Sequence, residues 1–273
     1  MKVAKGDVVR LHYTGKVKET GEVFDTTYEE VAKEAGLYRE EAVYGAVPII
    51  IGAGHVLKGL DEALEGLEVG KRYELEIPPE KGFGKRDFKL IKTLTLGQFK
   101  KHGVYPFPGL EVEIDGKRAR VLSVSSGRVR VDFNHPLAGK TLLYEVEIVE
   151  KIDDPIEQVK GLIELRLPKA NMERIQIEVG EKEVIIDFGE QETDPKHLAL
   201  GEILLEADLK ALGYETIEFK PTVEDLLKPP EAKVEEEVKE AEEEVKAEVK
   251  EEVEEVPSEE QKVEETREEE QEE

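Results

Sequence analysis

Residues 51–72 read IGAGHVLKGLDEALEGLEVGKR, and this stretch decides the fold of the first half of the chain. Directly after it, residues 73–77 alternate between apolar and charged side chains, which indicates a half-buried strand. The stretch itself predicts one short helix that covers a sheet. Its apolar residues fall on one helical face: Leu57, Leu60, Leu64 and Leu67.

Two further segments, around residues 9–13 and 144–148, show the same alternation and predict two more strands. We expect an α+β fold in which an antiparallel sheet wraps on the short helix. The strand that ends near Ile77 meets its partner only at residues 141–149, so the residues between them form an insertion. This organisation predicts a first domain made of residues 1–84 and 138–153.

The inserted segment, residues 85–137, is predicted to be a small β domain. Three short alternating runs within residues 110–133 are separated by Asp115-Gly116 and Ser126-Gly127, which are typical hairpin turns. The segment carries 11 Lys or Arg against 5 acidic residues. This positive charge indicates a solvated face, a docking site for the chain's own acidic tail, or attraction to acidic ribosomal or unfolded partners.

Residues 154–228 predict a small C-terminal α+β domain with the element order α-β-β-α-β. The first helix follows Asp154-Pro155, a hairpin turns at Gly180-Glu181, and the second helix starts at Asp194 and stops at Gly213. The second helix is apolar over a broad arc, which indicates either an ordinary core or a dimer interface. Its apolar residues are Leu198, Leu200, Ile203, Leu204, Leu205, Leu209 and Leu212.

The last segment, residues 229–273, is an acidic Glu-rich tail. Residues 231–273 hold 22 Glu and 6 Lys or Arg, which gives a net charge of −16. A thin valine stripe at spacings of four and seven is too narrow to fold alone. The segment is either a solvated, disordered or fraying helical tail or a charged arm for a basic partner.

The composition excludes several classes of protein. The 273 residues contain no Cys and carry a net charge of −26, so thiolate metal sites and cysteine nucleophiles are excluded and nucleic acid is not an expected partner. The five His are scattered, and the sequence has no phosphate-binding, nucleophile-elbow or zinc-protease motif. We expect a cytoplasmic protein that uses no cofactor and no metal and does not bind a membrane.

Four segments carry a resemblance to a known family: VRLHYTGKVKETGEVFDTT, IGAGHVLKGLDEALEGLEVGKR, IPPEKGFG and FNHPLAGKTLLYEVEIVE. In this order they resemble the FKBP-type peptidyl-prolyl cis-trans isomerases. The resemblance is to the SlyD-like forms with a domain inserted in the flap, and to the long archaeal type with an extra C-terminal domain. It spans residues 1–153.

The resemblance implies a proline pocket in the first domain. Tyr13, Asp25, Phe83 and Tyr144 would be the catalytic residues. The proline ring would contact Phe24, Ile49, Val56, Leu57 and Leu60. Two positions depart from the best-known members, which have a tryptophan in place of Leu60 and a tyrosine in place of Phe83.

Five apolar residues cluster in the inserted segment: Phe99, Val104, Tyr105, Phe107 and Leu110. They indicate either the core of the small β domain or, as the resemblance implies, an exposed surface that binds unfolded chains. The predicted function is therefore isomerisation of Xaa-Pro bonds in unfolded or nascent polypeptides, with chaperone activity from the insertion. The alternative is a non-enzymatic holdase that uses the pocket as a peptide-binding groove. A homodimer would form through the C-terminal domain.

Overall fold

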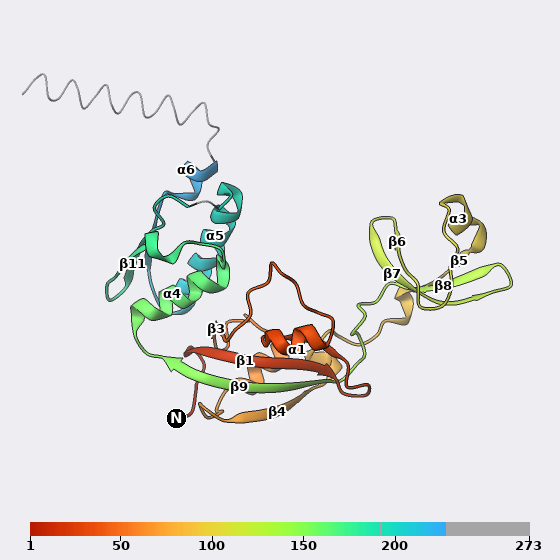
Figure 1. Cartoon of the computed structure of the whole chain (residues 1–273), viewed down its shortest axis with the longest axis horizontal. Coiled ribbons are helices and arrows are strands. Elements are labelled where there is room, and N and C mark those ends of the chain that lie inside the picture. The colour runs from red at the N-terminus through yellow and green to blue at the C-terminus, as the bar shows by residue number, and fades with distance from the viewer. Residues whose placement is uncertain (192, 228–273) are drawn as a thin grey trace, which may run out of the picture.

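The computed structural model describes residues 1–191 and 193–227, so the predicted acidic tail lies outside the described residues. Within these ranges the strands form three sheets, which we name the main, inserted and C-terminal sheets. The inserted sheet and the C-terminal elements lie at opposite ends of the main sheet (Figure 1). No helix in the described ranges is long and apolar enough to cross a membrane.

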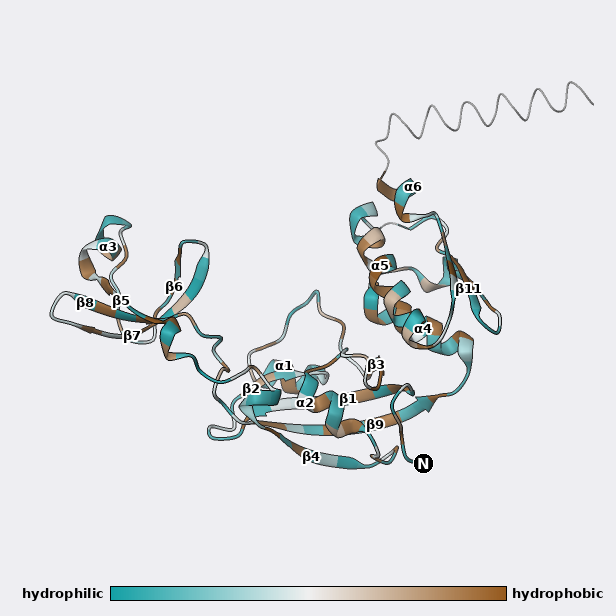
Figure 2. Cartoon of the chain, turned by 180° about the vertical axis from the view of Figure 1, so that it is seen from behind, coloured by the Kyte–Doolittle hydropathy of each residue, from teal (hydrophilic) through white to brown (hydrophobic). Residues whose placement is uncertain are grey.

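The main sheet has five antiparallel strands, in the order β2-β1-β9-β4 with β3 also paired to β1. Its two long central strands, β1 and β9, pair over ten residue positions with one register shift. Hydrophobic and hydrophilic residues alternate along β9 (Figure 2). The strands are β1 (Val8–Val17), β2 (Val23–Thr26), β3 (Val47–Ile50), β4 (Arg72–Ile77) and β9 (Leu142–Ile152).

One short helix, α2 (Lys58–Leu64), packs on the main sheet, and α1 (Glu29–Glu34) follows β2. Leu60 and Leu64 of α2 are fully buried in one apolar cluster with Val9 and Leu11 of β1. Burying these side chains is the main favourable contribution to the fold of this part. The predicted antiparallel sheet on a single short helix is confirmed.

The inserted sheet has the order β5-β8-β7-β6 and is antiparallel throughout. Both predicted hairpin turns are present, because Asp115 and Gly116, and likewise Ser126 and Gly127, have positive φ angles. The alternation did not predict the fourth strand, β5, or the helix α3 that follows it in the sequence. The elements are β5 (Ile91–Thr95), α3 (Leu96–Lys101), β6 (Glu111–Ile114), β7 (Lys117–Ser125) and β8 (Arg128–Asp132).

The C-terminal elements follow the predicted order α-β-β-α-β, with an additional short helix α6. β10 and β11 form the hairpin, and β12 pairs parallel to β11 after the helix α5 has crossed over. The elements are α4 (Pro155–Arg166), β10 (Gln176–Val179), β11 (Glu183–Asp187), α5 (Pro195–Ala211), β12 (Thr216–Lys220) and α6 (Val223–Leu227). Three 3₁₀ turns complete the part of the chain that the structure describes: Pro79–Lys81, Phe88–Leu90 and Met172–Arg174.

The C-terminal elements pack directly on one end of the main sheet. Val8, Ile50 and Ile152 of the main sheet belong to the apolar cluster of the C-terminal helices. Gly161 of α4 lies so close to Pro48 of β3 that a Cβ at Gly161 would be 3.0 Å from the proline Cβ. The two parts therefore share a continuous core.

Candidate active site

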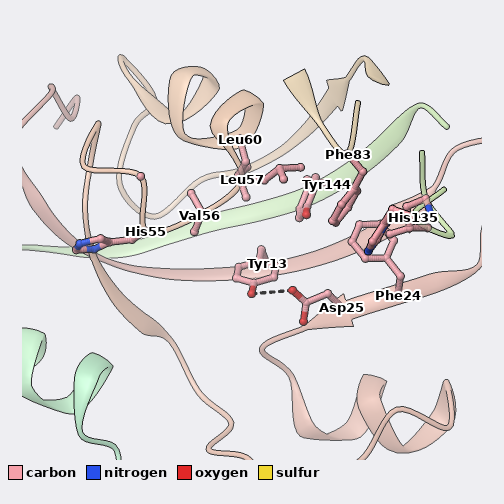
Figure 3. Close-up of a pocket in the computed structure, with 12 residues that line it drawn as sticks. Tyr13, Phe24, Asp25, His55, Val56, Leu57, Leu60, Phe83, His135 and Tyr144 are labelled. Carbon is pink, nitrogen blue, oxygen red and sulfur yellow. Dashed lines mark hydrogen bonds between the residues drawn. The ribbon is translucent and has the colours of Figure 1, made fainter. Parts of the chain in front are cut away.

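A pocket of about 470 Å³ opens between α2, the loop before it and the β1–β2–β9 region of the main sheet (Figure 3). A cavity of this size suits a small group of apolar atoms with a few polar contacts. Most of its lining residues are aromatic or aliphatic. The lining residues are Tyr13, Phe24, Asp25, Gly54, His55, Val56, Leu57, Leu60, Phe83, His135, Leu137 and Tyr144.

The polar edge of the pocket is formed by Tyr13 and Asp25, which come from β1 and β2. The Tyr13 hydroxyl donates a hydrogen bond of 3.0 Å to Asp25 Oδ2. Burial raises the pKa of Tyr13 well above its usual value, and the adjacent Asp25 charge raises it further. Burial likewise raises the pKa of Tyr144, so both phenols remain protonated at neutral pH. The pair presents a carboxylate at the mouth of an apolar hollow.

Phe24, Phe83 and Tyr144 form an aromatic wall with edge-to-face contacts. The Phe24 ring lies 5.7 Å from that of Tyr144 and 6.1 Å from that of Phe83, with interplanar angles of 86° and 84°. A Cβ on Gly15 would lie 2.7 Å from the Phe24 ring and 3.0 Å from the Tyr144 ring. Gly15 is thus required for this wall.

The floor of the pocket comes from the start of α2 and the loop before it. Leu60 is 1% exposed and Val56 and Leu57 are partly buried in the same apolar cluster. Since these side chains belong to the core of the main sheet, the floor is rigid. The leucine at position 60 makes a smaller floor than a tryptophan would.

Four lining residues were not predicted: Gly54, His55, His135 and Leu137. The last two lie in the motif FNHPLAGK. The His135 ring stacks on Phe83, with ring centroids 4.3 Å apart and an interplanar angle of 5°. Leu137 also lines the pocket. Both residues lie after β8, on the segment that returns from the inserted sheet to the main sheet. The insertion therefore reaches the pocket wall through its connecting segment.

The structure brings all but one of the predicted pocket residues together. Ile49 is the exception, since it is 1% exposed in the core of the main sheet and does not line the pocket. Ile49 belongs to the same apolar cluster as Leu60 and Leu64 of α2. Its predicted contact with the proline ring is therefore wrong.

The five predicted residues of the insertion divide into two groups. Phe99 is 6% exposed and belongs to the core of the inserted sheet, with Val104 and Leu110 packed against it. Phe99 is therefore no contact for a substrate. Tyr105 and Phe107 are 78% and 58% exposed. Phe88, which the sequence did not single out, is also 78% exposed.

Hydrogen bonds and ring contacts are what the pocket offers a ligand. The polar side chains that line it are two phenols, one carboxylate and two imidazoles. In residues 1–191 and 193–227, no three His, Asp or Glu side chains are grouped so that they could hold a metal ion. The pocket can grip a small apolar ring and present a carboxylate and a phenol beside it.

Comparison with known proteins identifies the class. The chain is 38% identical over 146 residues to the short-type peptidyl-prolyl cis-trans isomerase of Methanocaldococcus jannaschii, a match that covers 54% of this chain and 92% of that protein. It is 37% identical over 158 residues to the FKBP-type peptidyl-prolyl cis-trans isomerase SlyD of Aeromonas hydrophila, covering 54% of this chain and 64% of that protein. The SlyD of Treponema pallidum is 30% identical over 158 residues, with 54% and 77% covered.

The chain therefore belongs to the FKBP-type peptidyl-prolyl cis-trans isomerases, enzymes that act on proline-containing polypeptides. A family model described as "FKBP26, IF domain" matches residues 92–137, which hold the inserted sheet. Within the family, the chain is of the SlyD-like type.

Proposed function

We propose that the pocket is the isomerase site, with Tyr13, Asp25, Phe83 and Tyr144 in the catalytic role. Phe24, Val56, Leu57 and Leu60 would hold the proline ring. The observation that carries this proposal is the pocket itself, an aromatic hollow of about 470 Å³ with a hydrogen-bonded Tyr13–Asp25 pair at its mouth. Its size and lining fit a proline ring and the peptide bond before it.

The reaction needs no bond-making side chain. Rotation of an Xaa-Pro bond meets a barrier of about 18–20 kcal/mol, because the amide loses its resonance as it twists. A site accelerates the rotation when it binds the twisted form more tightly than either planar isomer. The twisted amide has less charge separation than the planar amide. An apolar hollow that removes water from the carbonyl oxygen therefore favours the twisted form.

Asp25 and Tyr13 would act at the polar edge of this hollow. The Tyr13 hydroxyl already donates a hydrogen bond to Asp25 Oδ2, and this hydrogen bond fixes both side chains. The carboxylate would then face the twisting carbonyl carbon, where its negative charge opposes the planar, charge-separated amide. Phe83 and Tyr144 would enclose the ring from the sides.

The insertion would supply chaperone activity. Tyr105 and Phe107 project from a stretch broken by Gly103, Pro106, Pro108 and Gly109, and both rings are mostly exposed. Exposed aromatic groups on a domain tethered to the domain that holds the pocket are suited to hold an unfolded chain. A segment bound there re-enters the pocket as an intramolecular partner, which raises its effective concentration.

Deletion of residues 87–133 tests whether the pocket supplies the isomerase activity and the insertion the chaperone activity. The shortened protein should turn over an Xaa-Pro tetrapeptide at nearly the full rate, because Phe83 and His135 remain. It should no longer accelerate the proline-limited refolding of a whole protein. If both substrates lose activity to the same extent, the insertion only supports the structure.

A homodimer is supported by one face of α5. Leu200 and Ile203 are 54% and 53% exposed, and Leu204 beside them is 39% exposed, whereas Leu198, Leu205 and Leu209 are core. Sedimentation of the full chain with and without the change Ile203→Glu tests whether the chain forms a dimer through this face. A dimer that dissociates on this change supports the proposal, and a wild-type monomer at micromolar concentration overturns it.

A further inference from the structure

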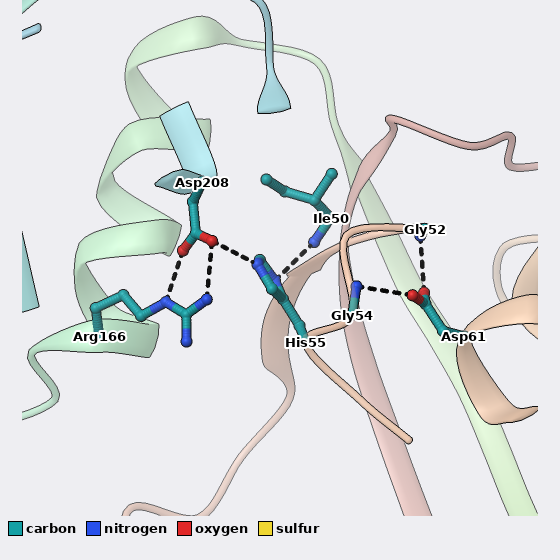
Figure 4. Close-up of polar contacts among 7 residues, drawn as sticks. All are labelled: Ile50, Gly52, Gly54, His55, Asp61, Arg166 and Asp208. Atoms are coloured by element: carbon teal, nitrogen blue, oxygen red, sulfur yellow. Dashed lines mark hydrogen bonds and ion pairs between the residues drawn. The ribbon is translucent and has the colours of Figure 1, made fainter. Parts of the chain in front are cut away.

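A buried hydrogen-bond network joins the pocket loop to the C-terminal helices (Figure 4). His55 lies between β3 and α2, lines the pocket and immediately precedes Val56. Its side chain is 2% exposed, and its Nε2 lies 2.8 Å from Asp208 Oδ1 on α5. The two residues are 153 positions apart in the sequence.

The second ring nitrogen of His55 fixes the direction of this contact. His55 Nδ1 lies 3.1 Å from the backbone nitrogen of Ile50 and accepts its N–H. An imidazole that accepts at Nδ1 carries its proton on Nε2. His55 therefore donates from Nε2 to Asp208, and the same ring bridges β3 and α5.

Asp208 is held in turn by Arg166, the last residue of α4. The guanidinium donates to both carboxylate oxygens, from Nε to Oδ2 over 2.6 Å and from Nη2 to Oδ1 over 2.8 Å. Burial alone would raise the pKa of Asp208, but the hydrogen bonds from Arg166 and His55 outweigh it and lower the pKa. Asp208 is therefore a fixed, charged acceptor that is only 6% exposed.

The other side of the loop is held by α2. Asp61 of α2 accepts the backbone N–H groups of Gly52 and Gly54, over 2.7 and 2.9 Å. Both glycines have φ angles near +80°, a conformation that other residues rarely adopt. The loop therefore depends on two carboxylates for its shape, one on α2 and one on α5. Val56 and Leu57 follow it directly into the pocket.

We propose that Asp208 and Arg166 are positioning residues of the isomerase, and that the C-terminal elements set the pocket wall through His55. The shared core with Val8, Ile50 and Ile152 holds α4 and α5 in place against the main sheet. The network transmits that placement to the loop of Val56 and Leu57. This proposal rests on the proposed role of the pocket as the proline site.

The test uses the full chain and an Xaa-Pro tetrapeptide. Asp208→Asn keeps the size of the side chain and removes the acceptor charge for His55. We expect kcat/KM to fall about fivefold, mainly through kcat, because a displaced wall grips the twisted peptide bond less well. Nitrogen NMR of the His55 ring should report a changed tautomer or proton exchange at Nε2.

A second variant separates the two halves of the network. In His55→Asn the side-chain oxygen can still accept the Ile50 N–H, but the amide is too short to reach Asp208. His55→Asn should lower kcat/KM as much as Asp208→Asn does. The double variant, which carries both changes, should lose no more kcat/KM than either single variant. Should Asp208→Asn fail to fold, His55→Asn decides, since it leaves the Arg166–Asp208 pair intact.

The matched control is Glu164→Gln. Arg10 Nη1 donates to Glu164 Oε2 over 2.9 Å, so this change removes the negative charge from a polar contact across the same interface, away from the loop. Its kcat/KM should stay at the wild-type value. Unchanged turnover in Asp208→Asn and His55→Asn, or an equal loss in Glu164→Gln, would overturn the proposal.

An Asp25→Ala variant assayed in parallel separates this proposal from the one on which it rests. If Asp25→Ala has no effect either, the assignment of the pocket fails. If Asp25→Ala lowers turnover and Asp208→Asn does not, only the coupling through His55 fails.

Discussion

The hydroxyl of Tyr13 and the carboxylate of Asp25 meet across the β1–β2 pair, with the phenol donating a hydrogen bond of 3.0 Å. The two strands are antiparallel here, and Gly15 stands opposite Asp25 in the register. This short pairing places the acidic side chain that lines the pocket beside its aromatic wall.

Asp25→Ala removes the carboxylate from the mouth of the pocket. We expect kcat/KM for an Xaa-Pro tetrapeptide to fall about tenfold, because a hydrogen bond to a charged group is worth roughly 1.5 kcal/mol or more. The measurement is the cis-to-trans rate at several enzyme concentrations. Glu22→Ala, at an exposed position near the turn between β1 and β2, is the control and should keep full activity. Equal turnover in both variants would remove Asp25 from the mechanism.

Gly15→Ala tests the aromatic wall. The added Cβ would lie 2.7 Å from the Phe24 ring, so the ring must move and the fold should lose about 1–3 kcal/mol. Turnover should fall together with stability. Gly97→Ala is the matched change, since its Cβ would meet nothing nearer than 3.9 Å and α3 should gain about 0.5–1 kcal/mol. Denaturant unfolding measures the change in stability, and the tetrapeptide assay measures the change in turnover. A Gly15→Ala protein as stable as wild type would contradict the close packing of the aromatic wall on Gly15.

Glu202 predicts a pH dependence of stability. It is fully buried on α5, and within residues 1–191 and 193–227 neither carboxylate oxygen has a hydrogen-bond partner. Burial raises its pKa to about 7. Since the folded pKa lies above the unfolded one, the folded state binds the proton more tightly, and stability falls as the pH rises from about 4.5 to 7.

Glu202→Met removes this titration. At pH 8 it should stabilise the protein by on the order of 3 kcal/mol relative to wild type, and at pH 4 the advantage should largely vanish. Denaturant unfolding at the two pH values measures it. Glu206→Met, on the exposed side of the same helix, should show no such difference between the two pH values. A Glu202→Met effect that is the same at both pH values would contradict the argument.

The exposed aromatic residues of the insertion give a separate prediction. Tyr105→Ser combined with Phe107→Ser should leave tetrapeptide turnover unchanged and weaken the suppression of aggregation of an unfolded protein. Both rings are mostly exposed, so their removal should cost little stability. Phe99→Ala is the contrasting variant, because loss of a buried ring costs roughly 3–5 kcal/mol and should unfold the inserted sheet. Undiminished suppression of aggregation in the double variant would exclude these rings as the capture surface.

The strands and hairpins could be predicted because period-two alternation and turns such as Asp115-Gly116 are local signals. β5 and α3 could not, because α3 begins at the residue directly after β5, with no turn between them to mark a boundary.

The candidate site was predictable where a motif carries it, as at Tyr13, Asp25 and Phe83. Periodicity could not decide that Phe99 is buried while Tyr105 is exposed, because both lie in the same short apolar cluster. Periodicity could not predict the contact between His55 and Asp208 either. The two residues are 153 positions apart in the sequence, and only tertiary packing brings them into contact.

The central claim is that an apolar hollow rotates the Xaa-Pro bond while no bond to the enzyme forms and no proton moves. The most direct measurement is tetrapeptide turnover by the full chain in H₂O and in D₂O. The account predicts clear acceleration over the uncatalysed rate, with kcat/KM the same in both solvents. No acceleration, or a large drop in kcat/KM in D₂O that indicates proton transfer in the rate-limiting step, would contradict it.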